Sequence, residues 1–159
     1  MQKNSGFTFF EIMIVLAIMA VLAAIAVPNM FAWRIDAKLR GAVENLKGDL
    51  NAAKMMAVRE NAFVVINFSA DRYEVFVDNG AGANAENWTR DPDERRIANR
   101  ALPAGVTIDL GATDFDSDRT RFNRRGLPEN LGSVVVAASN GDQQQVQLNR
   151  LGRINIQQL

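Results

Sequence analysis

The side chains that most often carry enzyme chemistry are scarce in this sequence. It has no cysteine and no histidine, which excludes thiolate nucleophiles, disulfides, zinc sites, haem ligation and imidazole acid–base catalysis. Nothing in it resembles a nucleophile with its base, and the acidic residues show no recognisable catalytic pairing. Basic and acidic residues balance, so no net charge draws the chain to a polyanion. We predict a protein that is not an enzyme and needs no cofactor.

One carboxylate lies within a long apolar segment, where a charged side chain raises the free energy of the chain. The run from Phe7 to Val27 is apolar except for Thr8 and Glu11. A carboxylate inside a spanning helix costs about 2.5 to 3.5 kcal/mol near the centre, less towards an end, and is normally retained with a partner. If the chain is cut after Gly6, Phe7 gains an α-amine one helical turn from Glu11. Paired between neighbouring subunits, the two groups would set the register of packed helices.

The same run is long enough to anchor the chain in a membrane. As a helix it crosses the roughly 30 Å hydrocarbon core of a bilayer. A secretory signal would carry its small-residue cleavage site after the apolar core, whereas Gly6 precedes it. Lys3 predicts a cytoplasmic N-terminus and an external remainder. The alternative is an uncleaved anchor with Glu11 in the headgroup zone, and Pro28 marks either a hinge or a plain boundary.

Beyond Pro28, apolar residues recur three and four positions apart, which is typical of an amphipathic helix. The series is Ile35, Leu39, Val43, Leu46, Leu50, Ala53 and Ala57. We predict one helix from Phe7 to Glu60, half in lipid and half against a soluble domain.

From Ala62 the apolar period changes to two, which indicates strands. The predicted strands are residues 63–68, 72–77, 106–110, 119–122, 133–138, 144–148 and 153–156, with a polar loop over 78–96. The first two form an antiparallel hairpin. The fold class is therefore α+β, with a long N-terminal helix packed on an antiparallel all-β domain of residues 61–159.

Arginines gather in the C-terminal half. Arg119, Arg121, Arg124 and Arg125 form a local basic cluster, and strand pairing could bring Arg150 and Arg153 close to it. Several cations on one face are what phosphate binding requires. The alternative is the solvated face of a strand, whose arginines pair with Asp114, Asp116 and Asp118.

Those three aspartates have the D-x-D-x-D spacing of a calcium loop. Arg119, however, stands where an EF-hand has glycine, and Arg125 stands where it needs a bidentate glutamate. We therefore predict a solvated loop and no metal.

The N-terminal segment from Lys3 to Glu11 resembles the cleavage region of type IV pilin precursors and of type II secretion pseudopilins. Gly6, Phe7, Glu11 and Pro28 match the family positions, while Phe9-Phe10 replaces an aliphatic pair. The resemblance implies that a prepilin peptidase removes leader residues 1–6, cuts between Gly6 and Phe7, and N-methylates Phe7. It also implies a single-pass protein of the bacterial inner membrane, with a periplasmic C-terminal domain and other pilins or pseudopilins as partners in a filament.

The C-terminal half resembles the GspH/FimT group of minor pseudopilins. The resemblance rests on Phe-Asn-Arg-Arg-Gly-Leu-Pro at 122–128, Val-Val-Val at 134–136 and the segment 146–154 with its Gly152-Arg153 pair. It implies a pilin fold and a structural subunit of a type II secretion pseudopilus or a type IV pilus, serving protein secretion or pilus assembly. The alternative is a binding module for a secreted protein or, as in some FimT-like proteins, for DNA during uptake. The DNA-binding candidates are Arg121, Arg124, Arg125, Arg150 and Arg153, with Asn155 in place of a second motif arginine.

Overall fold

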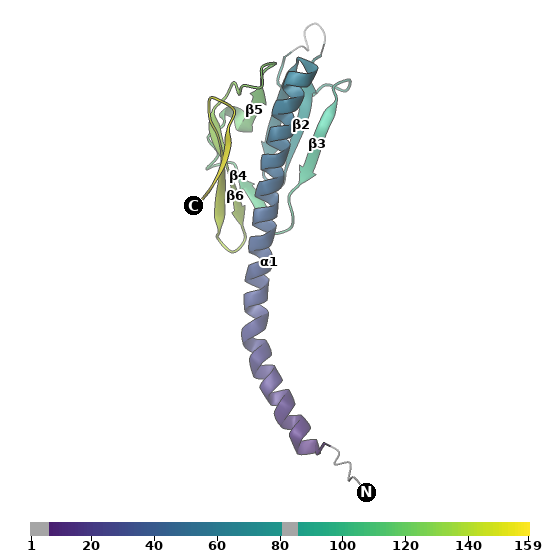
Figure 1. Cartoon of the computed structure of the whole chain (residues 1–159), viewed down its shortest axis with the longest axis vertical. Helices are drawn as coiled ribbons and strands as arrows, with labels where there is room; N and C mark the ends of the chain where they lie inside the picture. The colour runs from purple at the N-terminus through teal and green to yellow at the C-terminus, as the bar shows by residue number, and fades with distance from the viewer. Residues whose placement is uncertain (1–6, 81–85) are drawn as a thin grey trace. The chain divides into compact units, whose positions relative to one another are not determined.

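The computed structural model describes residues 7–80 and 86–159, and within these ranges one long helix precedes a series of strands (Figure 1). The helix α1 is Phe9–Glu60. The strands are β1 (Phe63–Ser69), β2 (Arg72–Asp78), β3 (Arg96–Ala101), β4 (Val106–Asp109), β5 (Arg119–Phe122), β6 (Gly132–Ala138), β7 (Gln143–Leu148) and β8 (Ile154–Gln158), and a 3-10 turn, η2 (Asp116–Asp118), precedes β5.

The chain divides into two compact units, Met1–Arg34 and Ile35–Leu159. In the first unit the described residues from Phe9 onward are helical. The second unit contains the rest of α1 and all the strands. The helix ends at Glu60, where the amphipathic pattern also ends. The predicted fold class, α+β with a long N-terminal helix on antiparallel β structure, is confirmed.

The strands form two antiparallel four-stranded sheets. Their orders are β3-β2-β1-β5 and β4-β6-β7-β8. The predicted hairpin is present as β1 and β2, paired from Phe63↔Asp78 to Ser69↔Arg72. The division into two sheets depends on contacts distant in sequence, such as the pairing of β1 with β5, which the local pattern does not reveal.

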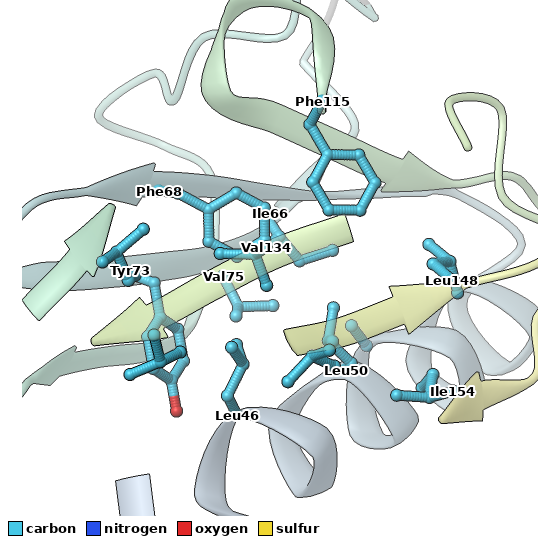
Figure 2. Packing of buried hydrophobic residues seen from close by; sticks show 14 of the residues in the cluster. Leu46, Leu50, Ile66, Phe68, Tyr73, Val75, Phe115, Val134, Leu148 and Ile154 are labelled. Atoms are coloured by element: carbon cyan, nitrogen blue, oxygen red, sulfur yellow. The ribbon is translucent and has the colours of Figure 1, made fainter. Parts of the chain in front are cut away.

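The core lies where the second half of α1 meets both sheets. The helix contributes a buried stripe that matches the predicted series, with Leu39, Leu46 and Leu50 at most 2% exposed. Figure 2 shows Leu46 and Leu50 facing Val75 of one sheet and Val134 and Ile154 of the other. Each such side chain contributes about 1.5–3 kcal/mol when fully buried. The helix therefore holds the two sheets together through a common apolar layer.

The sheet containing β1 also has a covered outer face. Side chains alternate along a strand, so Val65 and Phe76 point away from the helix, yet both are fully buried. Arg121 pairs with Val65 in the sheet register and lies on this outer face. The connection between β2 and β3 contributes Trp88, whose ring lies against the Arg121 guanidinium. This cover positions part of the arginine cluster.

One strand of the structure was not predicted from the sequence pattern. The segment after the predicted loop, Arg96–Ala101, is β3, an edge strand paired with β2. Its sequence, RIANRA, alternates poorly, and none of its residues is fully buried. It forms because β2 offers a free edge, and its arginines reach carboxylates on neighbouring elements, Arg96 to Glu74 and Arg100 to Asp49.

Candidate processing and assembly site

The first unit presents an apolar surface with one carboxylate. From Glu11 the next charged residue is Arg34, and the large apolar side chains between them are exposed. The helix is long and apolar enough to cross a membrane. Exposed Phe31 and Trp33 extend the apolar surface past the predicted boundary at Val27, and aromatic residues of this kind favour the membrane–water interface.

Thr8 and Glu11 form a capping box at the start of α1. The Thr8 backbone N–H donates to Glu11 Oε2 at 3.0 Å, and the Thr8 hydroxyl donates to the same oxygen at 3.1 Å. In return, the Glu11 N–H donates to Thr8 Oγ1 at 3.2 Å. The two side chains thus satisfy helix donors that have no partner within the helix. The Thr-x-x-Glu spacing is typical of this arrangement, which was not among the predictions from the sequence.

The remaining N-terminal candidates are placed only in part. Gly6, and with it the predicted cleavage bond, lies outside the described residues. Phe7 precedes the helix and is 83% exposed. Pro28 lies within α1, which continues on both sides of it.

Arg121 is held between two aromatic rings. Its guanidinium carbon lies 4.0 Å from the centroid of Trp88 and 4.2 Å from that of Phe63. Its Nε donates to Glu129 Oε2 at 2.6 Å, and the side chain is only 11% exposed. Contacts of this kind stabilise through both cation–π and charge-assisted hydrogen bonding. In this structure Arg121 packs the outer face of the sheet, and little of it is available to a ligand.

The carboxylate beside Arg121 is buried. Asp78 accepts a hydrogen bond from the Trp88 N–H at 3.1 Å and lies 3.9 Å from the Arg121 guanidinium. Burial raises the pKa of Asp78 above its usual value, and the nearby Glu94 carboxylate adds to the effect. Trp88 itself has a positive φ of 66°, which is rare for a bulky residue. These contacts fasten Trp88 to the sheet.

Two turns in the C-terminal half are built alike. We call Asn123–Leu127 and Asn149–Arg153 the twin turns. In each, the asparagine Oδ1 accepts the backbone N–H groups two and four residues later, at 2.9–3.1 Å. In each, a glycine N–H donates to the asparagine carbonyl, at 2.8 Å for Gly126 and 2.9 Å for Gly152. Both turns share the sequence pattern Asn-Arg-x-Gly, a short repeat that was not among the predictions from the sequence.

The twin turns are in contact with each other and with α1. A Cβ placed on Gly152 would lie 3.0 Å from the Gly126 carbonyl oxygen, and one on Gly126 would lie 2.9 Å from Val58 Cγ2. Lys54 Nζ donates to the Gly152 carbonyl at 3.1 Å. Arg125, Arg150 and Arg153 are exposed on these turns. The predicted proximity of Arg150 and Arg153 to the Arg124–Arg125 segment therefore arises from turn packing and not from strand pairing.

The ion pairs differ from the predicted ones. Within the described ranges, Arg121 pairs with Glu129 and Asp78, and Arg124 pairs with Glu86 at 2.5 Å. Arg119 instead lies 5.3 Å from the Trp88 centroid. The alternative in which these arginines pair with Asp114, Asp116 and Asp118 is wrong, because Trp88 lies against the arginines and the nearby carboxylates come from Asp78, Glu86 and Glu129.

The aspartate loop has its own local contacts. Asp114 Oδ2 accepts from the Ser133 hydroxyl at 2.7 Å, while Asp116 and Asp118 belong to η2. Among the described residues, no three acidic side chains converge in a way that could hold a metal ion.

Two family models match this chain. The model described as Type II transport protein GspH matches residues 42–152. This chain belongs to the GspH family. The model of the prokaryotic N-terminal methylation motif matches residues 1–27, which contain the Gly6-Phe7 bond and Glu11.

Individual proteins support the same assignment. The pilin-like protein PilA1 of Thermus thermophilus is 28% identical, over 98% of this chain and all of PilA1. The type IV major pilin protein PilA of Myxococcus xanthus is 31% identical, over 84% of this chain and 58% of PilA. Among solved structures, the minor pseudopilin EpsH from the type 2 secretion system of Vibrio cholerae superposes with a TM-score of 0.56 at 11% identity, covering 76% of this chain and 97% of EpsH. The likeness to EpsH shows the pilin fold, and the GspH family member described here is a structural subunit of the pilin or pseudopilin type.

Proposed function

We propose that this GspH family member is a minor, non-enzymatic filament subunit that a prepilin peptidase cuts between Gly6 and Phe7 and N-methylates at Phe7. Residues 1–6 are the leader, residues 7–27 span the bacterial inner membrane, and the β-rich domain of residues 61–159 is periplasmic. The observation that carries the proposal is the exposed apolar surface of the first unit with its single carboxylate at Glu11.

The exposed apolar surface of the first unit needs an apolar environment both before and after assembly. Monomeric soluble proteins rarely expose contiguous apolar patches above a few hundred Å². Before assembly, lipid covers these side chains and the helix satisfies its own backbone hydrogen bonds. After assembly, the apolar helices of neighbouring subunits take the place of lipid. The subunit therefore moves from membrane to filament without exposing this surface to water.

Glu11 supplies the register of that assembly. Removal of the leader creates an α-amine on Phe7, which is charged when solvated. In the uncut chain, the Glu11 carboxylate accepts from the Thr8 N–H and hydroxyl through one oxygen, Oε2. The other oxygen remains able to accept from the Phe7 amine of a neighbouring helix. Because an unpaired carboxylate is costly among apolar helices, one axial stagger is favoured over the others. Pro28, which cannot donate a backbone hydrogen bond, would ease the adjustment of the helix during packing.

Substitution of Glu11 tests this function. We expect Glu11→Ala to be inserted and cleaved after Gly6, yet to be absent from the filament fraction sheared or purified from cells. Glu44→Gln is the matched control, because Glu44 is an exposed carboxylate on the same helix in the second unit. Gly6→Val should block cleavage itself. Normal filament incorporation of both Glu11→Ala and Gly6→Val would refute the proposal.

DNA binding during uptake is the second candidate function. It is favoured by the exposure of Arg125, Arg150 and Arg153 on the twin turns, because none of the three has an ion-pair partner within the described ranges. Three clustered cations would contact phosphates, whereas Arg121 is committed to its rings and carboxylates. A binding role toward a secreted protein would use the same exposed surface.

A salt titration separates this candidate from a purely structural subunit. For the full chain in detergent, DNA affinity should fall as salt rises, and replacement of Arg125, Arg150 and Arg153 by alanine should reduce the slope of log K against log salt by about 3. Arg72→Ala, an exposed arginine in β2, is the control. Equal affinity of the triple variant and the control at every salt concentration would exclude DNA binding by the twin turns.

A further inference from the structure

The twin turns form an exposed surface that is both basic and apolar. We define the twin-turn surface as Arg125, Arg150, Leu151 and Arg153 with Val58 of α1 beside them. Leu151 is 76% exposed and Val58 is 54% exposed. The surface is rigidly built, because each turn is fixed by its own asparagine and Lys54 ties one of them to α1. It resembles the mixture of arginine and apolar contacts found at protein interfaces more than a solvated rim.

The segment between β4 and β5 has the opposite charge. We define the acidic loop as Asp114, Asp116, Ser117 and Asp118. Among the described residues, none of these carboxylates lies in an ion pair, although Asp114 accepts a hydrogen bond from Ser133. Phe115 anchors the loop by stacking on Phe68, with ring centroids 5.5 Å apart. Leu131, 41% exposed, precedes Gly132, which packs against Phe115 and Asp114. The loop is thus also a fixed surface with an apolar residue beside it.

One copy of the chain does not pair these two surfaces with each other. Asp118 directly precedes β5, whereas Asn123, the first residue of the twin turns, directly follows it. The acidic loop and the first twin turn therefore lie at opposite ends of the same strand. Both belong to the second compact unit, so their separation is set by the fold. Each surface therefore carries exposed charge of one sign that has no ion-pair partner within the described part of the same copy.

We propose that the twin-turn surface of one copy docks on the acidic loop of a second copy of this chain. The contact joins two different patches, so it is heterologous, and each added copy leaves one free surface of each kind at the ends. The contact stacks one copy on the next along an axis, so it forms wherever two copies of this minor subunit are neighbours in a filament, and in that respect the inference rests on the proposed function. Complementary charge sets the orientation of the contact, and Leu151 and Leu131 contribute apolar area.

Cysteine cross-linking tests the docking directly, because the chain has no cysteine of its own. Leu151→Cys and Ser117→Cys place one thiol on each surface and leave every arginine and aspartate intact. In membranes or filaments treated with a short bifunctional thiol reagent, the double variant should give dimers and larger species. Each single variant should remain monomeric, because a heterologous contact never brings two identical positions together. The matched control joins Leu151→Cys with Asn99→Cys on the exposed edge strand β3.

Charge reversal provides the second arm. Arg150→Asp with Arg153→Asp, introduced into the double-cysteine chain, should lower the cross-linking yield roughly tenfold or more, because like charges then face each other. Adding Asp116→Arg and Asp118→Arg should restore the yield by exchanging the two signs. Arg72→Asp, a reversal away from both surfaces, should leave the yield unchanged.

The outcomes distinguish this inference from the proposed function. If the double variant is cleaved and enters filaments but yields no more product than the Asn99 control, the docking is wrong and the filament role stands. A dimer from Leu151→Cys alone would show an isologous contact and also overturn the docking. Failure of cleavage or filament entry in the unaltered chain would instead contradict the proposed function.

Discussion

Gly126 and Gly152 occupy equivalent positions in the twin turns, and the two turns touch at these glycines. Both have positive φ, 73° and 69°, and a Cβ on Gly152 would lie 3.0 Å from the Gly126 carbonyl oxygen. The glycines therefore serve two purposes, since they permit the left-handed backbone conformation and allow the turns to approach closely.

Alanine at Gly152 should destabilise the second unit by roughly 1–3 kcal/mol, because a left-handed alanine is strained and the neighbouring atom is backbone that cannot move aside easily. Urea unfolding of the full chain in detergent measures this change. Gly48→Ala is the contrasting control, since nothing lies within 4 Å of its Cβ position on α1, and it should stabilise the protein by about 1 kcal/mol. A neutral Gly152→Ala would mean that the turns do not pack as described.

Removal of the Thr8 hydroxyl should loosen the start of the helix. Thr8→Val loses the acceptor of the Glu11 N–H and one donor to the Glu11 carboxylate. Loss of such a cap costs about 1 kcal/mol of helix stability, which is roughly a fivefold change in the opening equilibrium of the first turn. Amide hydrogen exchange of Glu11 in detergent micelles should accelerate by that factor, while Thr8→Ser should exchange as the unaltered chain does. Identical protection in the valine and serine variants would rule out the capping box.

The buried Tyr73 predicts a loss of stability at alkaline pH. Its hydroxyl donates to Asp49 at 2.7 Å, and burial followed by the Asp49 carboxylate raises the pKa of Tyr73 well above its usual value. Above about pH 10 the unfolded chain loses this proton first. The contribution is therefore fully present below that pH and is lost as the pH rises towards the folded pKa, which lowers the free energy of unfolding.

Tyr73 is the only tyrosine, so phenolate absorbance reports this group alone. We expect it to titrate only with unfolding, and Tyr73→Phe should show a flatter dependence of stability on pH above about pH 10. Titration of Tyr73 near its ordinary pKa in the folded chain would contradict the buried hydrogen bond.

Arg121 should matter for stability where Arg125 does not. Arg121→Ala removes the cation between Trp88 and Phe63 and leaves Glu129 and Asp78 without it, so a loss of roughly 2–4 kcal/mol is expected. Arg125→Ala, on an exposed turn, should stay within about 0.5 kcal/mol. Trp88 fluorescence during urea unfolding, in a Trp33→Phe background, measures both. Equal stability of the two variants would show that Arg121 does not pack the sheet.

The sequence predicts the parts of this fold that have a strong local period. The helix stripe from Leu39 to Ala57 and the β1–β2 hairpin follow from spacings of three, four and two residues. Strand β3 has no such period and forms only because β2 presents a free edge. The contacts of Arg119 and Arg121 depend on Trp88, which belongs to the connection between β2 and β3 and is distant from both arginines in sequence.

The candidate sites also divide into a part that local spacing predicts, at the N-terminus, and a part that it does not, at the twin turns. Spacing alone indicates the relation between Phe7 and Glu11 and would also have indicated the Thr8–Glu11 capping box. The contact between the twin turns depends on both turns packing against α1 near Lys54 and Val58, which no local pattern reveals.

The most direct test of the central claim is the mass of the N-terminal peptide of the protein recovered from cell membranes. Cleavage and methylation predict a first residue at Phe7 that carries one added methyl group on its amine. In cells that lack the prepilin peptidase, the protein should keep its leader, and the N-terminal peptide should begin at Met1. A peptide that still begins at Met1 in cells with an active peptidase would contradict the processing and assembly role of this segment.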